Sequence, residues 1–178
     1  LRNSILAGNR RHDSTIDAGV AAGMALGVVP PDMVSFAGVA PILVHLGKTG
    51  ETFEVSGVGP YPRKATADFY RTRCGGEIPS GVLRTVVPAA PDAWCTALER
   101  WGTLSFAQAV GPALECAAQG FPLSPFSASR TRANVERYRR FPTSAALYLR
   151  DGQAPAPGDR LVQSELAATI TLMIEGEK

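Results

Sequence analysis

The sequence predicts a mixed fold, either α+β or a layered α/β sandwich, in which helices cover a small antiparallel sheet. Three observations lead to this expectation. A helix-periodic segment comes first, over residues 14–29, a hairpin pattern follows over 41–56, and residues 65–174 are mainly helical. A length of 178 residues suits one domain, or one subunit of a larger protein, and can bury a sizeable core.

The first segment has the pattern of a helix in which most side chains are unusually small. Asp13 or Ser14 can cap its free N–H groups, and Pro30 with Pro31 ends it. Ile16, Val20 and Met24 follow one another at a spacing of four and form one apolar face. Alanine and glycine fill most positions between them: Ala18, Gly19, Ala21, Ala22, Gly23 and Ala25. Because each glycine weakens a helix by roughly 1 kcal/mol against alanine, we expect another element to pack very closely here.

The next segment predicts a hairpin, with strands over 41–46 and 51–56 and a glycine-containing turn between them. The first strand is almost wholly apolar, so both of its faces are expected to be covered. His45 interrupts it. A lone histidine in such a strand is expected to be structural, hydrogen-bonded by its neighbours, and not a ligand or a base.

The rest of the chain is expected to be mainly helical. We predict helices near 65–73, 92–101, 106–118, 127–140 and 164–174, and short strands at 82–87 and 146–149. Pro112 should kink or split its helix. Cys95 and Cys116 lie in apolar helical patterns, which predicts buried thiols. Three cysteines without a CxxC pair do not predict a disulfide framework or a zinc site.

Composition excludes several classes of partner. A net charge of +2 is too small to indicate nucleic acid or an anionic membrane, and no run of about eighteen apolar residues predicts a membrane span. No signal peptide is visible, which favours the cytoplasm; the chain does not begin with methionine, so a periplasmic or secreted location stays open. Nucleotide-binding and zinc-protease motifs are absent, so no cofactor or metal is expected. Two histidines, His12 and His45, do not predict a conventional catalytic triad.

Five stretches, taken in order, change this picture. They read IDAGVAAGMALGVV (16–29), PRKATADFY (62–70), Val87-Pro88 followed by ALERWG (97–102), GPALECAAQGFP (111–122) and PGDRLVQSELA (157–167). Each is similar to a segment of the gamma-glutamyltransferase (gamma-glutamyltranspeptidase) family, in the family's order. The chain therefore resembles the front portion of that family's large subunit, over residues 1–178.

The resemblance implies a fold and a mechanism. The fold would be the four-layer αββα sandwich of the N-terminal-nucleophile hydrolases, of which this chain supplies a part. Family members cleave themselves, and the new N-terminal threonine of a second, small subunit attacks a small-molecule amide, with its own amine as the base. Preorganised N–H donors stabilise the developing oxyanion. The resemblance thus implies no catalytic residue in this chain, and a partner subunit from the same precursor.

Two departures from the family's pattern bear on the substrate. The family's run of glycines after the first helix is here Ala37-Gly38-Val39-Ala40, a turn for which close backbone approach is less expected. The family's arginine for the α-carboxylate of the glutamyl group is replaced by Val58, counting back from the matching segment at Pro62. Valine cannot make that bidentate, charge-assisted contact. Arg63, five residues on, is the one candidate for binding an anionic substrate, although it also fits a surface arginine.

Three hypotheses follow. The first is a two-subunit amidohydrolase or acyl transferase acting on a small amide that is not gamma-glutamyl. The second is a genuine gamma-glutamyltransferase, or glutathione hydrolase, with a relocated carboxylate contact. The third is a non-catalytic paralogue that keeps the scaffold.

Overall fold

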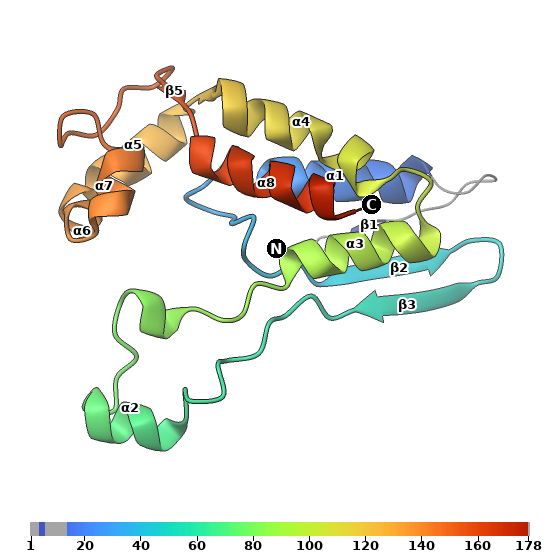
Figure 1. The fold of residues 1–178 in the computed structure, drawn as a ribbon, viewed down its shortest axis with the longest axis horizontal. Coiled ribbons are helices and arrows are strands. Elements are labelled where there is room, and N and C mark those ends of the chain that lie inside the picture. Colours follow the sequence, from blue (N-terminus) through green and yellow to red (C-terminus); the bar gives the residue numbers. More distant parts are fainter. Residues whose placement is uncertain (1–3, 6–13, 178) are drawn as a thin grey trace.

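The computed structural model describes residues 4–5 and 14–177, and it has helices on one side of a small sheet. Figure 1 shows α1 (Ser14–Leu26), α4 (Phe106–Gln119) and α8 (Ser164–Gly176) lying together, with α3 (Ala90–Trp101) next to the hairpin. The short helix α2 (Ala67–Arg73) lies apart from this group. The helices α5 (Pro125–Ala133), α6 (Val135–Arg139) and α7 (Pro142–Tyr148) gather at one end. Helices and strands are mixed as predicted.

The main sheet has three strands in the order β1 (Ser4–Ile5), β2 (Ile42–Leu46) and β3 (Glu51–Val55). β1 pairs with β2 in parallel, and β2 and β3 form the predicted antiparallel hairpin with Val44 opposite Phe53. The described residues cover only one face of β2, so the expectation that both faces are covered is met here for one face alone. Ile42 and Val44 are buried, whereas Leu43 on the opposite face is 49% exposed. Side chains alternate across a strand, so the helices described here cover one face only.

The core forms where α1 packs against α3, α4 and the sheet. Ile16, Val20 and Met24 are buried as the spacing predicted. The small residues of α1 do allow close packing, since a Cβ at Gly23 would lie 3.0 Å from Nε1 of the Trp94 indole. Small side chains of α3 and α4 complete the contact: Ala93, Ala97, Ala109, Ala113 and Ala117, all buried. Alanine and glycine at these positions therefore set how near the helices approach.

Two carboxylates hold the corner between α3 and α4. Asp17 of α1 is 3% exposed, and it accepts hydrogen bonds from the Thr103 hydroxyl (2.5 Å), the Thr103 N–H (2.8 Å) and the Leu104 N–H (3.2 Å). Glu177, just after α8, accepts from the N–H groups of Phe106 (2.5 Å) and Ala107 (2.9 Å) at the start of α4. Burial by itself raises the pKa of Asp17, but the hydrogen bonds from Thr103 and Leu104 outweigh it and the pKa is lowered.

Ser105 caps α4 in a capping box with Gln108. Of the two effects expected of Pro112, a kink or a split, the split does not occur, because α4 runs unbroken from Phe106 to Gln119 with the proline inside it. Proline removes one backbone donor. The helix tolerates that loss because its start is capped and its Ala109, Val110 and Ala113 face is buried.

Three other predictions need correction. Residues 82–87 contain a 3₁₀ turn, η1 (Val82–Arg84), and not a strand. A bond from the Arg84 N–H to the Gly81 carbonyl (3.0 Å) closes the turn, and the Tyr70 hydroxyl, from α2, donates to the Leu83 carbonyl at 2.6 Å. Residues 146–149 fall largely in α7, since Pro142 at its first turn favours a helix start. The single helix expected over 127–140 is two helices, divided at Asn134, whose side chain donates to the Arg130 carbonyl at 2.9 Å.

A second, two-stranded sheet pairs β4 (Phe121–Pro122) with β5 (Arg160–Leu161) antiparallel, which the sequence did not predict. Arg160 donates to the carbonyls of Gln119 (2.8 Å) and Gly120 (2.7 Å). This contact brings the chain before α8 to the end of α4.

Candidate functional site

Three backbone segments meet at the base of the hairpin and form the candidate site. They are the turn 37–40 before β2, the loop 56–61 after β3 and the stretch 86–90 that enters α3. The Ala40 N–H donates to the Gly57 carbonyl at 2.9 Å, and the Val87 N–H donates to the Pro60 carbonyl at 2.9 Å. The Gly38 carbonyl accepts from the N–H groups of Ala89 (3.1 Å) and Ala90 (3.0 Å). The turn is therefore tied to the loop and to the first helical donors of α3.

Gly57 and Gly59 make this junction possible, and the sequence reasoning missed their role. A Cβ at Gly57, whose φ is 53°, would lie 2.0 Å from the Ala40 carbonyl oxygen. A Cβ at Gly59 would lie 1.6 Å from the Val87 carbonyl oxygen. No side chain fits at either place. The signal in the sequence was a pair of glycines spaced by two, which on its own indicates only a loop.

The Ala37–Ala40 turn keeps close contacts of its own. A Cβ at Gly38 would lie 2.9 Å from the Ser35 carbonyl oxygen, and the Gly38 N–H donates to that same carbonyl at 3.0 Å. A side chain at position 38 would therefore collide with the Ser35 carbonyl, which explains why this position is glycine. The tightest backbone approaches lie across the junction, at Gly57 and Gly59.

Val58 stands between these two glycines, and its side chain is 56% exposed. Because the backbone on both sides is fixed, the position of Val58 is fixed as well. Other large apolar side chains of the three segments are also exposed: Val39, Tyr61 and Val87. The described part of this junction presents an apolar rim and not a charged one.

Arg63 follows the loop 56–61 in the chain and is not one of the residues that the junction's hydrogen bonds join. It is exposed, in the turn where the Ala65 N–H donates to the Pro62 carbonyl at 2.8 Å. Among the described residues, its guanidinium makes no ion pair or hydrogen bond. Neither Arg63 nor Val58 lines any of the three pockets found around α5, α6, α7 and the start of α8, and the role of Arg63 in anion binding stays a prediction.

Other candidate groups have structural explanations. His45 Nδ1 lies 2.9 Å from the Thr52 hydroxyl on the neighbouring strand, as expected of a structural histidine. Cys95 is exposed, which corrects the expectation of a buried thiol, because the buried face of α3 runs through its neighbours Ala93, Trp94 and Ala97. Partial burial, with the nearby charges of Asp92 and Glu177, raises the pKa of the Cys95 thiol. A raised pKa disfavours the nucleophilic thiolate.

Within residues 4–5 and 14–177, no three histidine, cysteine, aspartate or glutamate side chains are grouped so that they could hold a metal ion. Over the same residues, no helix is both long enough and apolar enough to cross a membrane.

Comparison with known proteins now identifies the family. The model of the gamma-glutamyltranspeptidase family matches residues 9–177. The chain is 33% identical over 172 residues to a glutathione hydrolase-like YwrD proenzyme of Bacillus subtilis, covering 95% of this chain and 33% of the relative. It is 35% identical over 170 residues to an acylase ACY 1 proenzyme of a Pseudomonas species, covering 90% of this chain and 30% of the relative.

A solved structure supports membership of the same family. The crystal structure of Helicobacter pylori gamma-glutamyltranspeptidase superposes with a TM-score of 0.84 at 28% identity, covering 91% of this chain and 48% of that chain. The helix-covered sheet therefore defines a fold of the class found in gamma-glutamyltranspeptidases and acylases. The chain belongs to the gamma-glutamyltranspeptidase family. It spans about a third of the length of the curated relatives it matches.

Proposed function

We propose that this chain is the front portion of the large subunit of an amide-bond hydrolase or acyl transferase that cleaves itself. The nucleophile is an N-terminal threonine on a second subunit from the same precursor, so no catalytic residue lies in this chain. Two observations support this: the match to the family over residues 9–177 and the proenzyme names of the relatives. The rest of the four-layer αββα sandwich would cover the exposed face of the hairpin, where Leu43 lies.

The substrate we propose is a small amide that is not gamma-glutamyl. The observation that carries this is Val58, exposed and rigidly placed at the position where the family resemblance expects a carboxylate-binding arginine. An exposed valine on a junction whose other large apolar side chains, Val39 and Val87, are also exposed favours an uncharged acyl group at this point. The relative named as an acylase is in keeping with such a substrate.

A panel of three p-nitroanilides tests the substrate. The complete gene product would be assayed with gamma-glutamyl, glutaryl and butyryl p-nitroanilide, which differ in the terminal ammonium and carboxylate. We expect kcat/KM for the butyryl amide to be at least equal to that for the gamma-glutamyl amide. Val58→Arg places a positive charge at position 58. It should raise the ratio of kcat/KM for the gamma-glutamyl amide to kcat/KM for the butyryl amide roughly tenfold to a hundredfold, which is the free energy of one charge-assisted hydrogen bond expressed as a ratio.

Val39→Arg is the matched control. Val39 is an exposed valine on the adjoining turn (48%, against 56% for Val58), so this variant adds the same charge nearby without placing it at position 58. An equal rise in the preference for the gamma-glutamyl amide in both variants would indicate general electrostatic attraction and would refute the assignment of Val58.

Intact-mass analysis and N-terminal sequencing of the purified protein test the mechanism. An uncleaved precursor without amidase activity would favour the non-catalytic paralogue.

A genuine gamma-glutamyltransferase is the second candidate function, favoured by relatives named glutathione hydrolase proenzymes. In this case the exposed Arg63 would take the carboxylate in place of residue 58. Arg63→Gln would then lower kcat/KM for the gamma-glutamyl and glutaryl amides and leave the butyryl amide unchanged. No change with any of the three amides would exclude Arg63.

A further inference from the structure

A strongly basic segment lies away from the hairpin junction, over residues 130–140. Its charged side chains are five arginines and one glutamate, so its positive charge is larger than the net charge of +2 of the whole chain. The arginines are Arg130, Arg132, Arg137, Arg139 and Arg140. The positive charge of the chain is therefore concentrated here, and the proposed catalytic function uses none of these residues.

The break between α5 and α6 brings three of these arginines to one pocket. On a straight helix, residues 132 and 137 would point about 140° apart, because each residue turns the helix by about 100°. The chain instead turns at Asn134, between the two helices. Arg132, Arg137 and Arg140 consequently line one pocket of about 770 Å³, which is within the size range of small-molecule sites. All three side chains are exposed, so a ligand can reach them.

A distant part of the chain completes the wall of this pocket. Ser80, just before η1, lines it together with Phe141, the residue that precedes α7. The backbone at Gly81 lies close to Phe141, since a Cβ there would be 3.3 Å from the ring. The pocket therefore offers a hydroxyl group and an aromatic surface beside three guanidinium groups.

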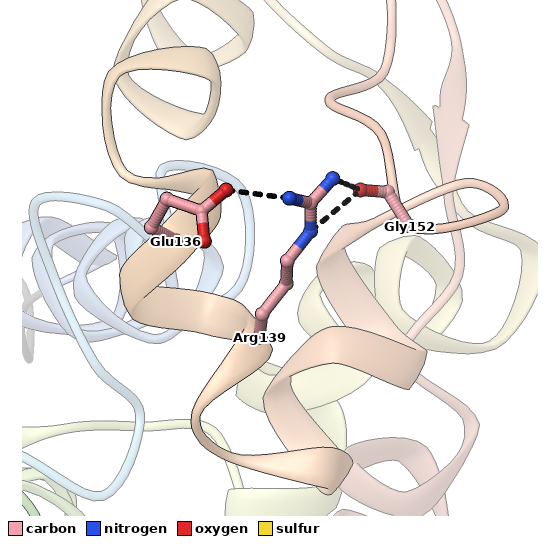
Figure 2. Close-up of polar contacts among 3 residues, drawn as sticks. All are labelled: Glu136, Arg139 and Gly152. Atoms are coloured by element: carbon pink, nitrogen blue, oxygen red, sulfur yellow. Dashed lines mark hydrogen bonds and ion pairs between the residues drawn. The ribbon is translucent and has the colours of Figure 1, made fainter.

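Glu136 is the one carboxylate in the lining, and it is already paired. Its Oε1 lies 2.5 Å from Nη1 of Arg139. Figure 2 shows that Arg139 also donates to the Gly152 carbonyl, from Nε (3.2 Å) and Nη2 (2.7 Å). The other three arginines of the lining form no ion pair with any residue that the structure describes. The pocket thus keeps three positive charges that no carboxylate described here compensates.

Such a cluster is unfavourable unless an anion occupies it. Residues three apart are neighbours on a helix surface, and like charges at this spacing, as for Arg137 and Arg140, destabilise the helix. A guanidinium group presents a rigid fork of N–H donors that fits two oxygens of a phosphoryl group at once. A singly charged anion would leave two of the three charges uncompensated, so the cluster favours an anion of several charges.

We infer that this pocket binds the polyphosphate group of a small molecule, with phosphoryl oxygens at Arg132, Arg137 and Arg140. A terminal phosphoryl group carries about −1.5 to −2 charges at pH 7, so two or three linked groups balance the three arginines. The group is either free polyphosphate or part of a nucleotide, for whose base Phe141 offers a stacking surface. This inference does not depend on the proposed catalytic activity.

Anions that differ in charge and chemistry test the inference. Isothermal titration calorimetry of the complete gene product, without divalent cations, would compare tripolyphosphate, ATP, inorganic phosphate and citrate. We expect tripolyphosphate to bind at least about tenfold more tightly than inorganic phosphate, which corresponds to one further charge-assisted hydrogen bond. Equal affinities for ATP and tripolyphosphate would identify the phosphate chain alone as the ligand. Tighter binding of ATP that is lost in Phe141→Ala would identify a nucleotide.

Substitutions locate the binding. Arg132→Gln and Arg140→Gln should each weaken tripolyphosphate about tenfold. Arg130→Gln is the matched control, because Arg130 is an exposed arginine of the same helix that does not line this pocket and whose guanidinium lies 6.0 Å from the Phe126 ring. This variant should change the affinity less than about twofold, since salt screens an exposed charge outside the site. Circular dichroism and thermal unfolding would verify that each variant is folded.

Three results would overturn the inference. Equal losses of affinity in Arg130→Gln and Arg132→Gln would indicate diffuse attraction to a basic surface. Tighter binding of citrate than of tripolyphosphate would show that the pocket selects carboxylates. If tripolyphosphate does not bind to the folded wild-type protein, other residues of the complete protein cover the three arginines.

Discussion

Replacing Asp17 by asparagine tests how the corner between α3 and α4 is held. The carboxylate accepts three hydrogen bonds from Thr103 and Leu104, with donor–acceptor distances of 2.5–3.2 Å. Asparagine keeps the shape but removes the charge. Hydrogen bonds to a charged group contribute about 1.5–3 kcal/mol and neutral ones about 0.5–1.5 kcal/mol. Thr103 and Leu104 are exposed residues, so water compensates in part, and we expect the free energy of unfolding to fall by about 2 kcal/mol.

Urea unfolding of the complete gene product measures this change, and Asp151→Asn is the control. Asp151 lies in a turn with φ of 49°, a conformation that asparagine adopts equally well, so this variant should be neutral.

The lowered pKa of Asp17 adds a pH test. Its contribution is complete above the unfolded pKa of about 3.9 and is lost as the pH falls through the lower folded pKa. The difference between wild type and Asp17→Asn should therefore shrink in acid. A difference under about 0.5 kcal/mol at pH 7, or one that grows in acid, would refute the reasoning.

Two further predictions concern stability, each measured by urea unfolding against a matched variant. Gly59→Ala should lower the free energy of unfolding by about 3 kcal/mol or more, because its Cβ would lie 1.6 Å from the Val87 carbonyl oxygen. Gly111→Ala on α4 meets open space and should be neutral or stabilising, so equal losses in the two would contradict the close approach at Gly59. Glu177→Gln should destabilise by about 1–2 kcal/mol, since the amide satisfies only one of the two α4 donors. Glu175→Gln, also exposed near the end of α8, should leave the free energy of unfolding unchanged. A similar loss of stability in this variant would contradict a stabilising role for the Glu177 hydrogen bonds to the start of α4.

The sequence predicted the elements whose pattern is local and strong. The four-residue spacing of α1 and the turn-linked strands of the hairpin are set by side-chain periodicity, and both are confirmed. The small residues of α1 correctly predicted a close neighbour, although only the structure shows that Trp94 is part of it. Residues 82–87 were wrongly predicted because an apolar run of this length fits a strand or a turn equally well. Tertiary bonds such as the one from Tyr70 to Leu83 then decide between them.

The candidate site was only partly predictable. Val58 was identified through the family resemblance, but its fixed position depends on contacts with Ala40 and Val87, which are distant in sequence. Periodicity carries no information about such contacts.

The corner between α3 and α4 also has a consequence for the route of folding. Asp17 reaches it from 86 residues earlier in the chain, and Glu177 from 71 residues later. Closing loops of this length loses chain entropy before the hydrogen bonds can form. We therefore expect the two carboxylates to form their hydrogen bonds late in folding, on a corner that α3 and α4 have already built. Contacts that form after the transition state of folding slow unfolding and change the folding rate little. Asp17 and Glu177 should therefore act mainly on the unfolding rate.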